Sequence, residues 1–556
     1  MYNKKLTLNE AFASGVKNHQ LNKFKDAENF YKYVLKKAPK HFGSVFYLGT
    51  LFLQTNKFGL ARRLLQKAIQ IKPDFVEGYN NLGATLKELG EYNKALKYLK
   101  KALQIKPSYV DAYNNLGAVL NILGEYQQAK NYLEKAIKIQ PKYSSLYKNL
   151  ALTFQELGGI KQEINCFKKL AELEKNPADA YQNLARLFVV LGDTSKAIEY
   201  YKKAIKYEPE NLSFYYHLHD LDKKFLNLKF SKKINHIIKS KNSTKKNIAY
   251  GNFLLANYEF NIKNYEKEFN YLLKGHKNFL GSNAYNFKKE INYWLNLLPK
   301  CKDLFNINSS KKVIKEASHT IQPIFIVGVP RCGSTLIEKI ISSGEKSIPM
   351  GEETGIISSF VKRKIMNKKS INSEVETFQV ELLKKYKERN LVNSKSNYIF
   401  TDKTLDNFFY IGLIKKVFPK AKVIHCRRSP ISSIISILKN NMPTLYWAHD
   451  LDNIFEYFDI YYRTMDRYNK ILPNYIYDLE LEKLSNNPIL ESQKLMQYCD
   501  LPWSEKCLEF YKRKDLISRT TSNLQVRKAV YKHLSIKNNP YKIFLEKYEK
   551  KYAWFK

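Results

Sequence analysis

Apolar and polar residues repeat with a period of 34 positions over the first 217 residues of the chain. Each period contains two stretches with the apolar spacing of a helix, a glycine between them and a proline at the end. An alanine recurs in the second stretch, where a small side chain lets two helices approach closely. The pattern predicts about six helix-turn-helix units over residues 8–211, with these recurring positions: Pro39, Pro73, Pro107, Pro141, Pro209, Gly90, Gly124, Gly158, Gly192, Ala27, Ala61, Ala95, Ala129 and Ala197.

From Gln322 onward the pattern changes. The run PIFIVGV is continuously apolar and contains a glycine near its end, which is typical of a buried parallel strand, and STLIEKIISS has the spacing of a helix. NYIFTDK (397–403) and AKVIHC (421–426) predict two further strands, each followed by a helical segment. Strands that alternate with helices predict a parallel sheet with helices on both faces.

We therefore expect three parts: a repeat array over residues 1–217, a connector of degenerate helical repeats over 218–320, and an α/β domain over 321–556. In the connector, AYGNFLLANYEFNIKNYEKEFNYLLKGHKNF reads as a helix pair with repeat-like spacing. A chain of 556 residues is long enough for this division, since a domain typically takes about 150 residues.

The composition is strongly basic, with 94 Lys and Arg against 52 Asp and Glu and a formal net charge of +42. Only 13 of the basic residues are arginines, and ten of these lie between Arg331 and Arg527. Arginine presents a planar fork that lysine cannot copy, so this region is expected to make forked contacts to an anion. Because no motif of a nucleic-acid reader is present, we attribute the remaining charge to composition and expect no nucleic-acid partner.

The six cysteines are scattered and form no CxxC pair, which argues against a disulfide framework or a zinc site. The N-terminus has no apolar signal segment, and no apolar run is long enough to span a membrane. We therefore expect a cytoplasmic protein without a bound metal. A homodimer stays open as a further state.

The segment IFIVGVPRCGSTL combines a strand, a glycine-bearing turn and the start of a helix, which together point backbone N–H groups at an anion. Gly328 and Gly333 have the GxxxxG spacing of an ATP-binding loop. The lysine of that loop is missing, because Ser334 and Thr335 follow directly, and the cation Arg331 lies inside the loop. We expect a ligand with less terminal charge and no metal. A phosphosulfate fits, since its sulfuryl end carries a single negative charge.

Arg428 and Ser436 form a second candidate pair, in CRRSPISSIIS at the end of the third predicted strand. They lie eight positions apart, which is about two helical turns. A helix would bring both to one phosphate, with the arginine as a fork and the serine as a hydroxyl donor. Arg427 is the competing residue, and the R-x-P register favours Arg428.

Taken together, PRCGSTL and the R-x-P-x5-S pattern resemble the sulfotransferases that use 3′-phosphoadenosine 5′-phosphosulfate (PAPS), over roughly residues 322–550. The resemblance implies a P-loop-like three-layer α/β domain, with PAPS as co-substrate and no metal. It also implies that Arg428 and Ser436 hold the 3′-phosphate. The 5′-phosphosulfate would then be held by the loop residues Arg331, Cys332, Gly333, Ser334 and Thr335.

MGEETG resembles the segment that follows this loop in the tyrosylprotein sulfotransferases, where the second glutamate is the general base. The resemblance gives that role to Glu353. A carboxylate suits a phenol, which loses its proton as its oxygen attacks sulfur. Glu352 is left to bind a cation or to orient the loop. His425 and His449 are the next candidates for the base.

FTDKT and TTSNLQVRK extend the resemblance. Lys403 matches the family's lysine that stabilises charge on the bridging oxygen as the S–O bond breaks, much as an oxyanion-hole donor does. Ser522 would be a second transition-state donor, and Gln525 and Arg527 would close over the nucleotide. The chain departs from the family beside the adenine, where Leu481 replaces an aromatic residue, so adenine stacking stays open.

The repeats resemble the tetratricopeptide repeat, whose units stack into a superhelix with a concave groove. One asparagine per repeat would face that groove: Asn81, Asn115, Asn149 and Asn183. The row resembles the asparagine ladder that holds peptide backbones in the O-linked N-acetylglucosamine transferase, and amides suit this task because each donates and accepts. A packing habit of the repeat is the equal alternative.

These resemblances predict a sulfotransferase that moves a sulfuryl group from PAPS to a hydroxyl acceptor, with a protein or peptide tyrosine recruited by the repeat groove. A small phenol, a glycan and a lipid stay open as acceptors. A P-loop kinase-like protein is a second class, against which the missing lysine argues. A non-catalytic repeat scaffold is a third, against which the loop, the base and the lysine together argue.

Overall fold

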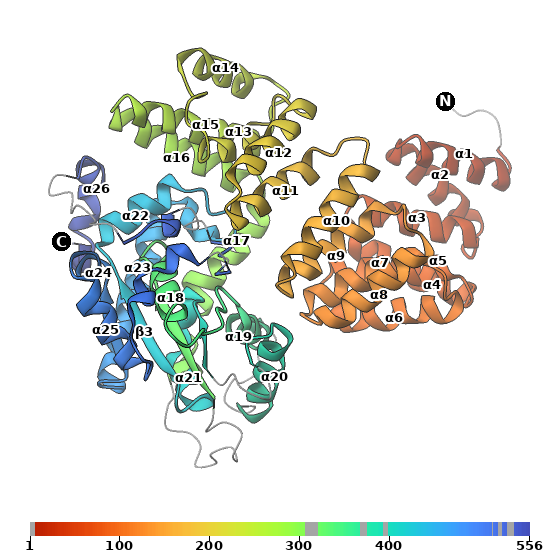
Figure 1. The fold of residues 1–556 in the computed structure, drawn as a ribbon. Coiled ribbons are helices and arrows are strands. Elements are labelled where there is room, and N and C mark those ends of the chain that lie inside the picture. Colours follow the sequence, from red (N-terminus) through yellow and green to blue (C-terminus); the bar gives the residue numbers. More distant parts are fainter. Residues whose placement is uncertain are drawn as a thin grey trace. The chain divides into compact units, whose positions relative to one another are not determined.

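The computed structural model describes residues 6–305, 321–366, 375–392, 399–513, 515–516, 518–520, 525–530 and 539–555. The chain falls into two compact units, Met1–Ala180 and Tyr181–Lys556. Figure 1 gives the labels of the elements. Within the described ranges, no helix is long and apolar enough to cross a membrane.

The first unit consists of successive helix pairs, as the 34-residue period predicts. The helices of a pair pack closely: a Cβ on Gly83 would lie 2.7 Å from Leu99 Cδ2, and Ala95 is fully buried nearby. Between the helices of the third pair the chain turns at Gly90, with φ of 76°, which glycine adopts without steric cost. The helices of this unit are α1 (Leu8–Gln20), α2 (Phe24–Lys37), α3 (Phe42–Gln54), α4 (Phe58–Ile71), α5 (Val76–Glu88), α6 (Tyr92–Ile105), α7 (Val110–Ile122), α8 (Tyr126–Ile139), α9 (Ser144–Glu156) and α10 (Ile160–Leu173).

Further helices lead from the repeats to the sheet. The predicted connector pair is present as α15 and α16. Tyr216 of α13 accepts a hydrogen bond from the backbone N–H of Asn441 at 3.1 Å, so the end of the helical region contacts the α/β part. The elements are α11 (Ala178–Leu191), α12 (Thr194–Tyr207), α13 (Leu212–His219), α14 (Leu228–Lys239), α15 (Lys245–Asn261), α16 (Tyr265–Gly281), α17 (Ala284–Asn292) and a π-helical turn at Tyr293–Leu297.

A four-stranded parallel sheet follows, with the strand order β2-β1-β3-β4. Its central strands β1 and β3 are almost fully buried, as their apolar runs predict. Strand β4 was not predicted, because only Leu479 of its five residues is buried and its apolar pattern is therefore weak. The strands are β1 (Gln322–Gly328), β2 (Ile399–Asp402), β3 (Lys422–Arg427) and β4 (Ile476–Glu480).

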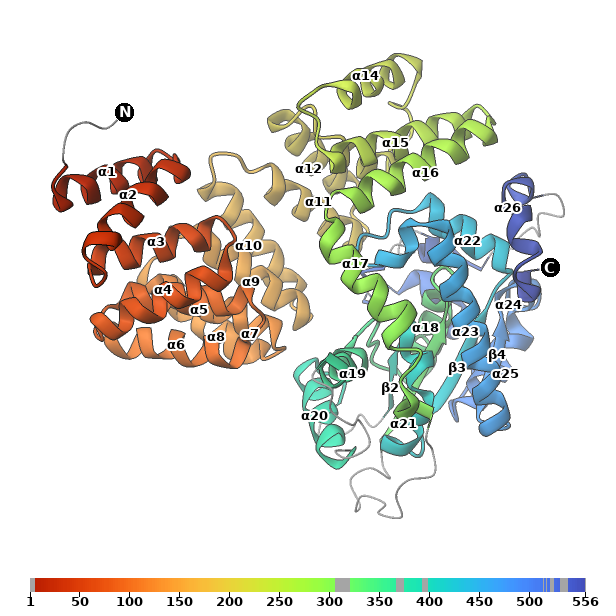
Figure 2. The same cartoon turned by 180° about the vertical axis from the view of Figure 1, so that it is seen from behind.

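Helices cover both faces of this sheet: α18 lies on one face and α23 on the other in the opposite views of Figures 1 and 2. The predicted fold class is confirmed: helical repeats are followed by an α/β domain with a parallel sheet. Its helices are α18 (Ser334–Ser342), α19 (Ile356–Met366), α20 (Val375–Glu388), α21 (Ile411–Val417), α22 (Pro430–Lys439), α23 (Leu451–Ile471), α24 (Leu481–Asn486), α25 (Pro488–Tyr498) and α26 (Lys542–Glu549).

The strand ends decide where a site can form. Strands β1, β2 and β3 end at Gly328, Asp402 and Arg427. All are parallel, so the segments that follow them meet at one edge of the sheet. This carboxyl edge is where open α/β sheets bind ligands.

Two buried histidines join the connector to this edge. His276 of α16 and His449 face each other with their Nδ1 atoms 2.9 Å apart. Their outer Nε2 atoms lie 2.8 Å and 3.1 Å from the carbonyl oxygens of Leu438 and Met442. Two neutral rings carry two N–H protons, whereas these three contacts need three. Burial opposes the third proton, and it lowers the pKa of His276 to about 4 and that of His449 to about 3.

The histidine pair predicts that the fold loses stability in mild acid. An unfolded histidine has a pKa of about 6.5, so below that pH the unfolded chain binds protons that the folded pair refuses. The stability contributed by the pair is therefore fully present above about pH 6.5 and falls toward pH 4. The expected loss is roughly 2 to 3 kcal/mol for one such histidine by pH 4.5. Urea unfolding between pH 7.5 and 4.5 would measure it.

The double variant His276→Gln and His449→Gln should reduce that pH dependence, and His217 and His219, whose pKa burial also lowers to about 4, should retain part of it. The exposed His236 offers a matched control, and His236→Gln should keep the wild-type slope. An unchanged slope in the double variant would assign the acid sensitivity to other groups.

Candidate active site

The loop of residues 328–335 follows β1 and holds strained backbone. Arg331 has φ of 71° and Gly333 has φ of 98°, both in the left-handed region. For a non-glycine residue such as Arg331, this region costs of order 1 kcal/mol or more. At Gly333 a Cβ would also lie 2.7 Å from Leu481 Cδ1. The loop conformation therefore depends on neighbouring contacts that hold it.

Arg331 is held by the motif that follows β3. Its Nε donates to the hydroxyl of Ser436 at 2.9 Å, and Arg428 Nη1 donates to its carbonyl oxygen at 3.1 Å. The fold thus brings the two predicted anion-binding motifs together, although they are about a hundred residues apart in the chain. Arg427 is the exposed last residue of β3, and its charge acts on Asp478. The geometry favours Arg428 over Arg427 as the residue beside the loop.

Two further contacts fix the same corner. The thiol of Cys426 donates to the carbonyl oxygen of Cys332 at 3.0 Å, which joins β3 to the loop. The backbone N–H of Ser429 donates to Glu482 Oε1 at 3.1 Å, just before Pro430 begins α22. Glu482 follows Leu481, which is buried against Gly333. The segment that departs from the sulfotransferase pattern therefore supports the loop through both residues.

Glu353 and Lys403 meet beside this loop. Lys403 follows β2 directly, and its fully buried ammonium lies 3.1 Å from Glu353 Oε1, whereas the Glu353 side chain is 55% exposed. Burial alone would lower the pKa of Lys403. The carboxylates of Glu353, Glu338 and Glu352 outweigh burial and raise the pKa above its ordinary value. Lys403 is therefore a permanent buried cation that holds an accessible carboxylate.

Glu338 and Glu352 position this pair from beneath. Glu338 Oε1 accepts from the backbone N–H of Glu352 at 3.0 Å and from the hydroxyl of Thr401 at 2.7 Å. Glu338 is fully buried, and burial raises its pKa to about 7. The carbonyl oxygen of Glu352 accepts from the N–H of Lys403 at 2.7 Å. Sequence reasoning missed Glu338, because STLIEKIISS carries only the signal of a helix.

The carboxylate of Glu352 holds a segment near the C-terminus. It accepts from the backbone N–H of Arg519 at 2.9 and 3.1 Å. The next residue, Thr520, shares a hydrogen bond with Thr335 of the loop at 3.2 Å. Of the two roles expected for Glu352, this contact supports orientation of a segment. Arg519 was not predicted as a site residue, because it lies just outside the TTSNLQVRK motif, which begins at Thr520.

Three further predicted site residues belong to the segment near the C-terminus: Ser522, Gln525 and Arg527. Ser522 lies outside the described residues. Gln525 begins a short 3-10 helix that ends at Arg527. Arg527 Nη2 donates to the carbonyl oxygen of Val190 at 2.7 Å, so its guanidinium contacts the end of α11.

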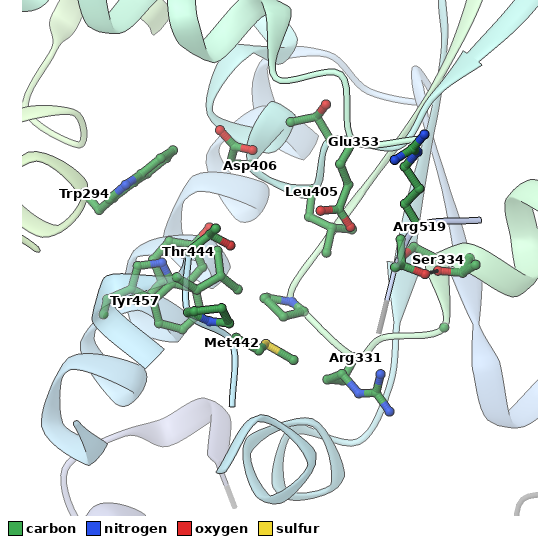
Figure 3. A pocket seen from close by; sticks show the side chains of 18 residues that line it. Trp294, Arg331, Ser334, Glu353, Leu405, Asp406, Met442, Thr444, Tyr457 and Arg519 are labelled. Atoms are coloured by element: carbon green, nitrogen blue, oxygen red, sulfur yellow. Dashed lines mark hydrogen bonds between the residues drawn. The ribbon is translucent and has the colours of Figure 1, made fainter. Parts of the chain in front are cut away.

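A cavity of about 290 Å³ opens beside the loop. Figure 3 shows Glu353 pointing into it. Its lining includes the loop residues Pro330, Arg331, Gly333, Ser334 and Thr335, together with Arg519 and Thr520. An apolar set, the apolar wall, also lines it: Trp294, Leu405, Met442, Pro443, Leu445, Trp447 and Tyr457. A group that reacts with an anion on the loop would meet Glu353 in this cavity.

The histidines expected as alternative bases are engaged elsewhere. His425 is buried, with Nδ1 2.5 Å from Asp478 Oδ1 and Nε2 in contact with the hydroxyl of Tyr461. His449 forms the buried pair with His276. Both rings therefore use both nitrogens in internal contacts, and Glu353 stays the base candidate that faces the cavity.

The asparagine row of the first unit makes contacts between neighbouring repeats. Asn115 Nδ2 donates to Asn80 Oδ1 at 2.8 Å, and Asn149 Nδ2 donates to Asn114 Oδ1 at 2.7 Å. Asn81 Nδ2 donates to Thr50 Oγ1 at 3.1 Å. These amides therefore help to join the repeats, as the packing alternative requires, and all three side chains are only partly buried. Asn183 lies on α11, in the second unit.

Comparison with protein families matches both parts of the chain. Residues 323–505 match a model described as the sulfotransferase family. A tetratricopeptide repeat model matches residues 76–109, 110–143 and 178–211, and a second TPR model matches residues 49–90. The chain therefore carries tetratricopeptide repeats and a sulfotransferase-family domain, and this domain supports sulfotransferase activity.

Comparison with individual proteins gives partial likenesses. An uncharacterised protein of Aquifex aeolicus (strain VF5) is 29% identical over 302 residues, which are 51% of this chain and 38% of that protein. This chain thus spans less than two fifths of that relative's length. The crystal structure of MamA is 28% identical with a TM-score of 0.27, over 30% of this chain and 96% of MamA. A thermophilic TPR protein of Thermus thermophilus is 20% identical with a TM-score of 0.30, over 33% of this chain and all of that protein.

Proposed function

We propose that this protein transfers a sulfuryl group from PAPS to a phenolic hydroxyl, with a tyrosine of a protein or peptide as the acceptor. The observation that carries the proposal is the Glu353–Lys403 pair, 3.1 Å apart beside an anion-binding loop and at a cavity. A carboxylate and a buried ammonium at one point supply the two charges that the transfer needs, a base for the acceptor and a cation for the leaving group.

The donor would lie along the carboxyl edge of the sheet. The backbone N–H groups of the 328–335 loop and the side chains of Arg331, Ser334 and Thr335 would hold the phosphosulfate. Arg428 and Ser436 would hold the 3′-phosphate, and both already contact Arg331. Entry of the donor would replace these internal hydrogen bonds with charge-assisted bonds to phosphate oxygens. Gln525 and Ser522 keep their proposed roles beside the nucleotide and the transferring group.

Arg519 supplies a cation that the sequence motifs do not include. It lines the cavity, and its backbone is fixed by Glu352. The loop lacks the lysine of an ATP-binding loop. We propose that Arg519 compensates part of the charge on the phosphosulfate. Arg527, which contacts Val190, would have to leave α11 to close over the nucleotide.

The reaction would proceed by in-line displacement. Glu353 takes the phenol proton as the phenol oxygen attacks sulfur, and the new O–S bond forms as the S–O bond to the 5′-phosphate breaks. The desulfated nucleotide leaves with the electron pair of that bond, and Lys403 neutralises the developing charge. As Lys403 turns toward the leaving oxygen, Glu353 loses a cationic neighbour and becomes a better base.

The cavity favours a phenol over bulkier acceptors. Its volume of about 290 Å³ is near the lower end of small-molecule sites. Much of its lining is formed by aromatic and aliphatic side chains, which suit a flat ring. A tyrosine side chain and a small phenol both satisfy these limits. We propose that residues 1–217 recruit the polypeptide that carries the tyrosine and that residues 321–556 catalyse the sulfuryl transfer. Residues 218–320 would connect these two parts.

Donor binding should depend on Arg428 and need no metal. PAPS and its desulfated product should raise the melting temperature without Mg²⁺, whereas ATP, which has no 3′-phosphate, should do so weakly. Arg428→Ala should weaken binding of the desulfated product by about 1.5–3 kcal/mol, the usual loss for a charged hydrogen bond. The neighbouring Arg427→Ala is the matched control and should bind normally. Calorimetry measures both affinities, and equal stabilisation by ATP with Mg²⁺ would count against the proposal.

Glu353→Gln should separate catalysis from donor binding. The amide keeps the size of the side chain but cannot take the phenol proton, so turnover should fall about 10²- to 10⁴-fold. Affinity for the desulfated product should stay within about twofold. Glu352→Ala should instead lower both, because it releases the segment of Arg519. Steady-state rates on 4-nitrophenol and calorimetry give the two readouts, and full turnover by Glu353→Gln would show that another group is the base.

The asparagine row should matter for a polypeptide acceptor alone. The quadruple change of Asn81, Asn115, Asn149 and Asn183 to Ala should raise KM for a tyrosine-containing polypeptide, since each amide contributes about 0.5–1.5 kcal/mol. Turnover of a small phenol should not change. Asn80→Ala with Asn114→Ala is the matched control, because it breaks two of the same bonds between repeats and keeps the row. An equal rise in KM for the polypeptide in both variants would show that the asparagine row serves packing between repeats and not peptide binding.

A further inference from the structure

The cavity contains a second carboxyl group, Asp406, besides Glu353. Asp406 lies in the 3-10 helix Leu405–Tyr410, which follows β2 and Lys403 closely. Its Oδ2 is buried and accepts no hydrogen bond among the described residues. A buried acceptor without a partner, on a residue that lines a cavity, favours a ligand that donates to it once the side chain turns toward the cavity.

Other negative charges lie near Asp406. Burial raises the pKa of Asp406 to about 7; its own backbone N–H and the Ser358 hydroxyl lower the pKa, and the nearby carboxylates of Asp402 and Glu353 raise it. The side chain of Asp402 is occupied, because it accepts from Thr354 and Tyr386 at 2.7 Å. Glu353 is engaged by Lys403. Asp406 is therefore the carboxyl of this group that has spare hydrogen-bonding capacity toward a ligand.

Trp294 adds an aromatic surface to the same cavity. It lies in the π-helical turn Tyr293–Leu297, a rare geometry that occurs frequently at functional sites. Figure 3 draws Trp294 and Asp406 on the side of the cavity away from Arg331 and Ser334. The indole face of a tryptophan attracts cations more strongly than any other aromatic side chain.

We infer that the acceptor carries a protonated amine besides its hydroxyl, and that this amine binds between the Asp406 carboxylate and the Trp294 ring. An ammonium satisfies both groups at once, since it donates to the carboxylate and is attracted to the ring. A sugar hydroxyl would satisfy the carboxylate but would leave the apolar wall without a matching surface. The inference rests on the proposed sulfotransferase function and specifies its acceptor class.

Two kinds of acceptor could carry this amine. It can belong to a small aminoalkyl phenol that occupies the cavity alone. It can also be the side chain of a lysine next to the acceptor tyrosine in a polypeptide. Both sources place a cation a few ångströms from the reacting hydroxyl, so one pair of protein groups recognises both.

Three phenols with the same ring test the inference: 4-(2-aminoethyl)phenol, 4-ethylphenol and 3-(4-hydroxyphenyl)propanoate. With saturating PAPS, kcat/KM should be highest for the cation and lowest for the anion. Asp406→Asn keeps the shape and removes the charge, so it should lower kcat/KM for the cation roughly 10- to 100-fold. The rate for 4-ethylphenol should stay within about threefold. Asp466→Asn, the same change at an exposed carboxyl that does not line the cavity, is the matched control and should keep the order.

Two tyrosine peptides that differ in one residue distinguish the sources. If a lysine supplies the amine, the peptide with Lys beside Tyr should exceed the one with Gln beside Tyr, and Asp406→Asn should remove the difference. If the peptides react equally while the small phenols obey the order, the acceptor is a small amine. Equal loss for all three phenols in Asp406→Asn, or no loss at all, would overturn the inference.

A binding measurement tests the amine subsite separately from the proposed sulfotransferase activity. Calorimetry of 4-(2-aminoethyl)phenol with the complex of enzyme and desulfated nucleotide needs no turnover. Binding that is lost in Asp406→Asn, without sulfation of any phenol, would keep the amine subsite and overturn the phenol-sulfating function. Sulfation of all three phenols with no effect of Asp406→Asn would support the phenol-sulfating function and overturn the amine subsite.

Discussion

The site depends on one buried charge, the ammonium of Lys403. A lysine with no exposed side-chain surface would lose its proton unless carboxylates surrounded it, and Glu353, Glu338 and Glu352 do so. Each of these carboxylates has a second task. Glu353 faces the cavity, Glu338 joins α18 to β2 through Thr401, and Glu352 holds Arg519. The requirement to neutralise one cation therefore connects the loop, the strand end and the C-terminal segment.

The sheet explains why these groups can meet. Parallel strands β1, β2 and β3 end side by side, and the segments after them carry Arg331, Lys403 and Arg428. Arg331 takes a left-handed conformation that costs energy, and Ser436 and Arg428 bind its side chain and its carbonyl oxygen. A bound anion would take over these hydrogen-bond donors. Contacts that hold the loop ready thus come from the groups proposed to hold the donor.

The sequence predicted features that rest on periodicity or on local motifs. The 34-residue period located the helix pairs, and the apolar runs located β1, β2 and β3. Strand β4 was not predicted, because its side chains are mostly half-exposed and leave no clear apolar pattern. Glu338, Asp406 and Arg519 were not predicted, because they lie just outside the recognised motifs and their positions in the site come from tertiary contacts. The bonds from Asn115 to Asn80 and from Asn149 to Asn114 escaped because they join repeats 35 residues apart.

The apolar wall of the cavity is built by segments that lie outside the predicted site motifs. Trp294 comes from the connector, and residues 442–445 follow α22. Those residues are held by the bond from Asn441 to Tyr216 and by the His276–His449 pair, both of which reach into the helical region. Changes in the helical region can therefore reshape the acceptor side while Arg331, Lys403 and Arg428 stay in place. Under the proposed function, acceptor choice could therefore vary independently of the donor chemistry, and the donor motifs alone would not identify the acceptor.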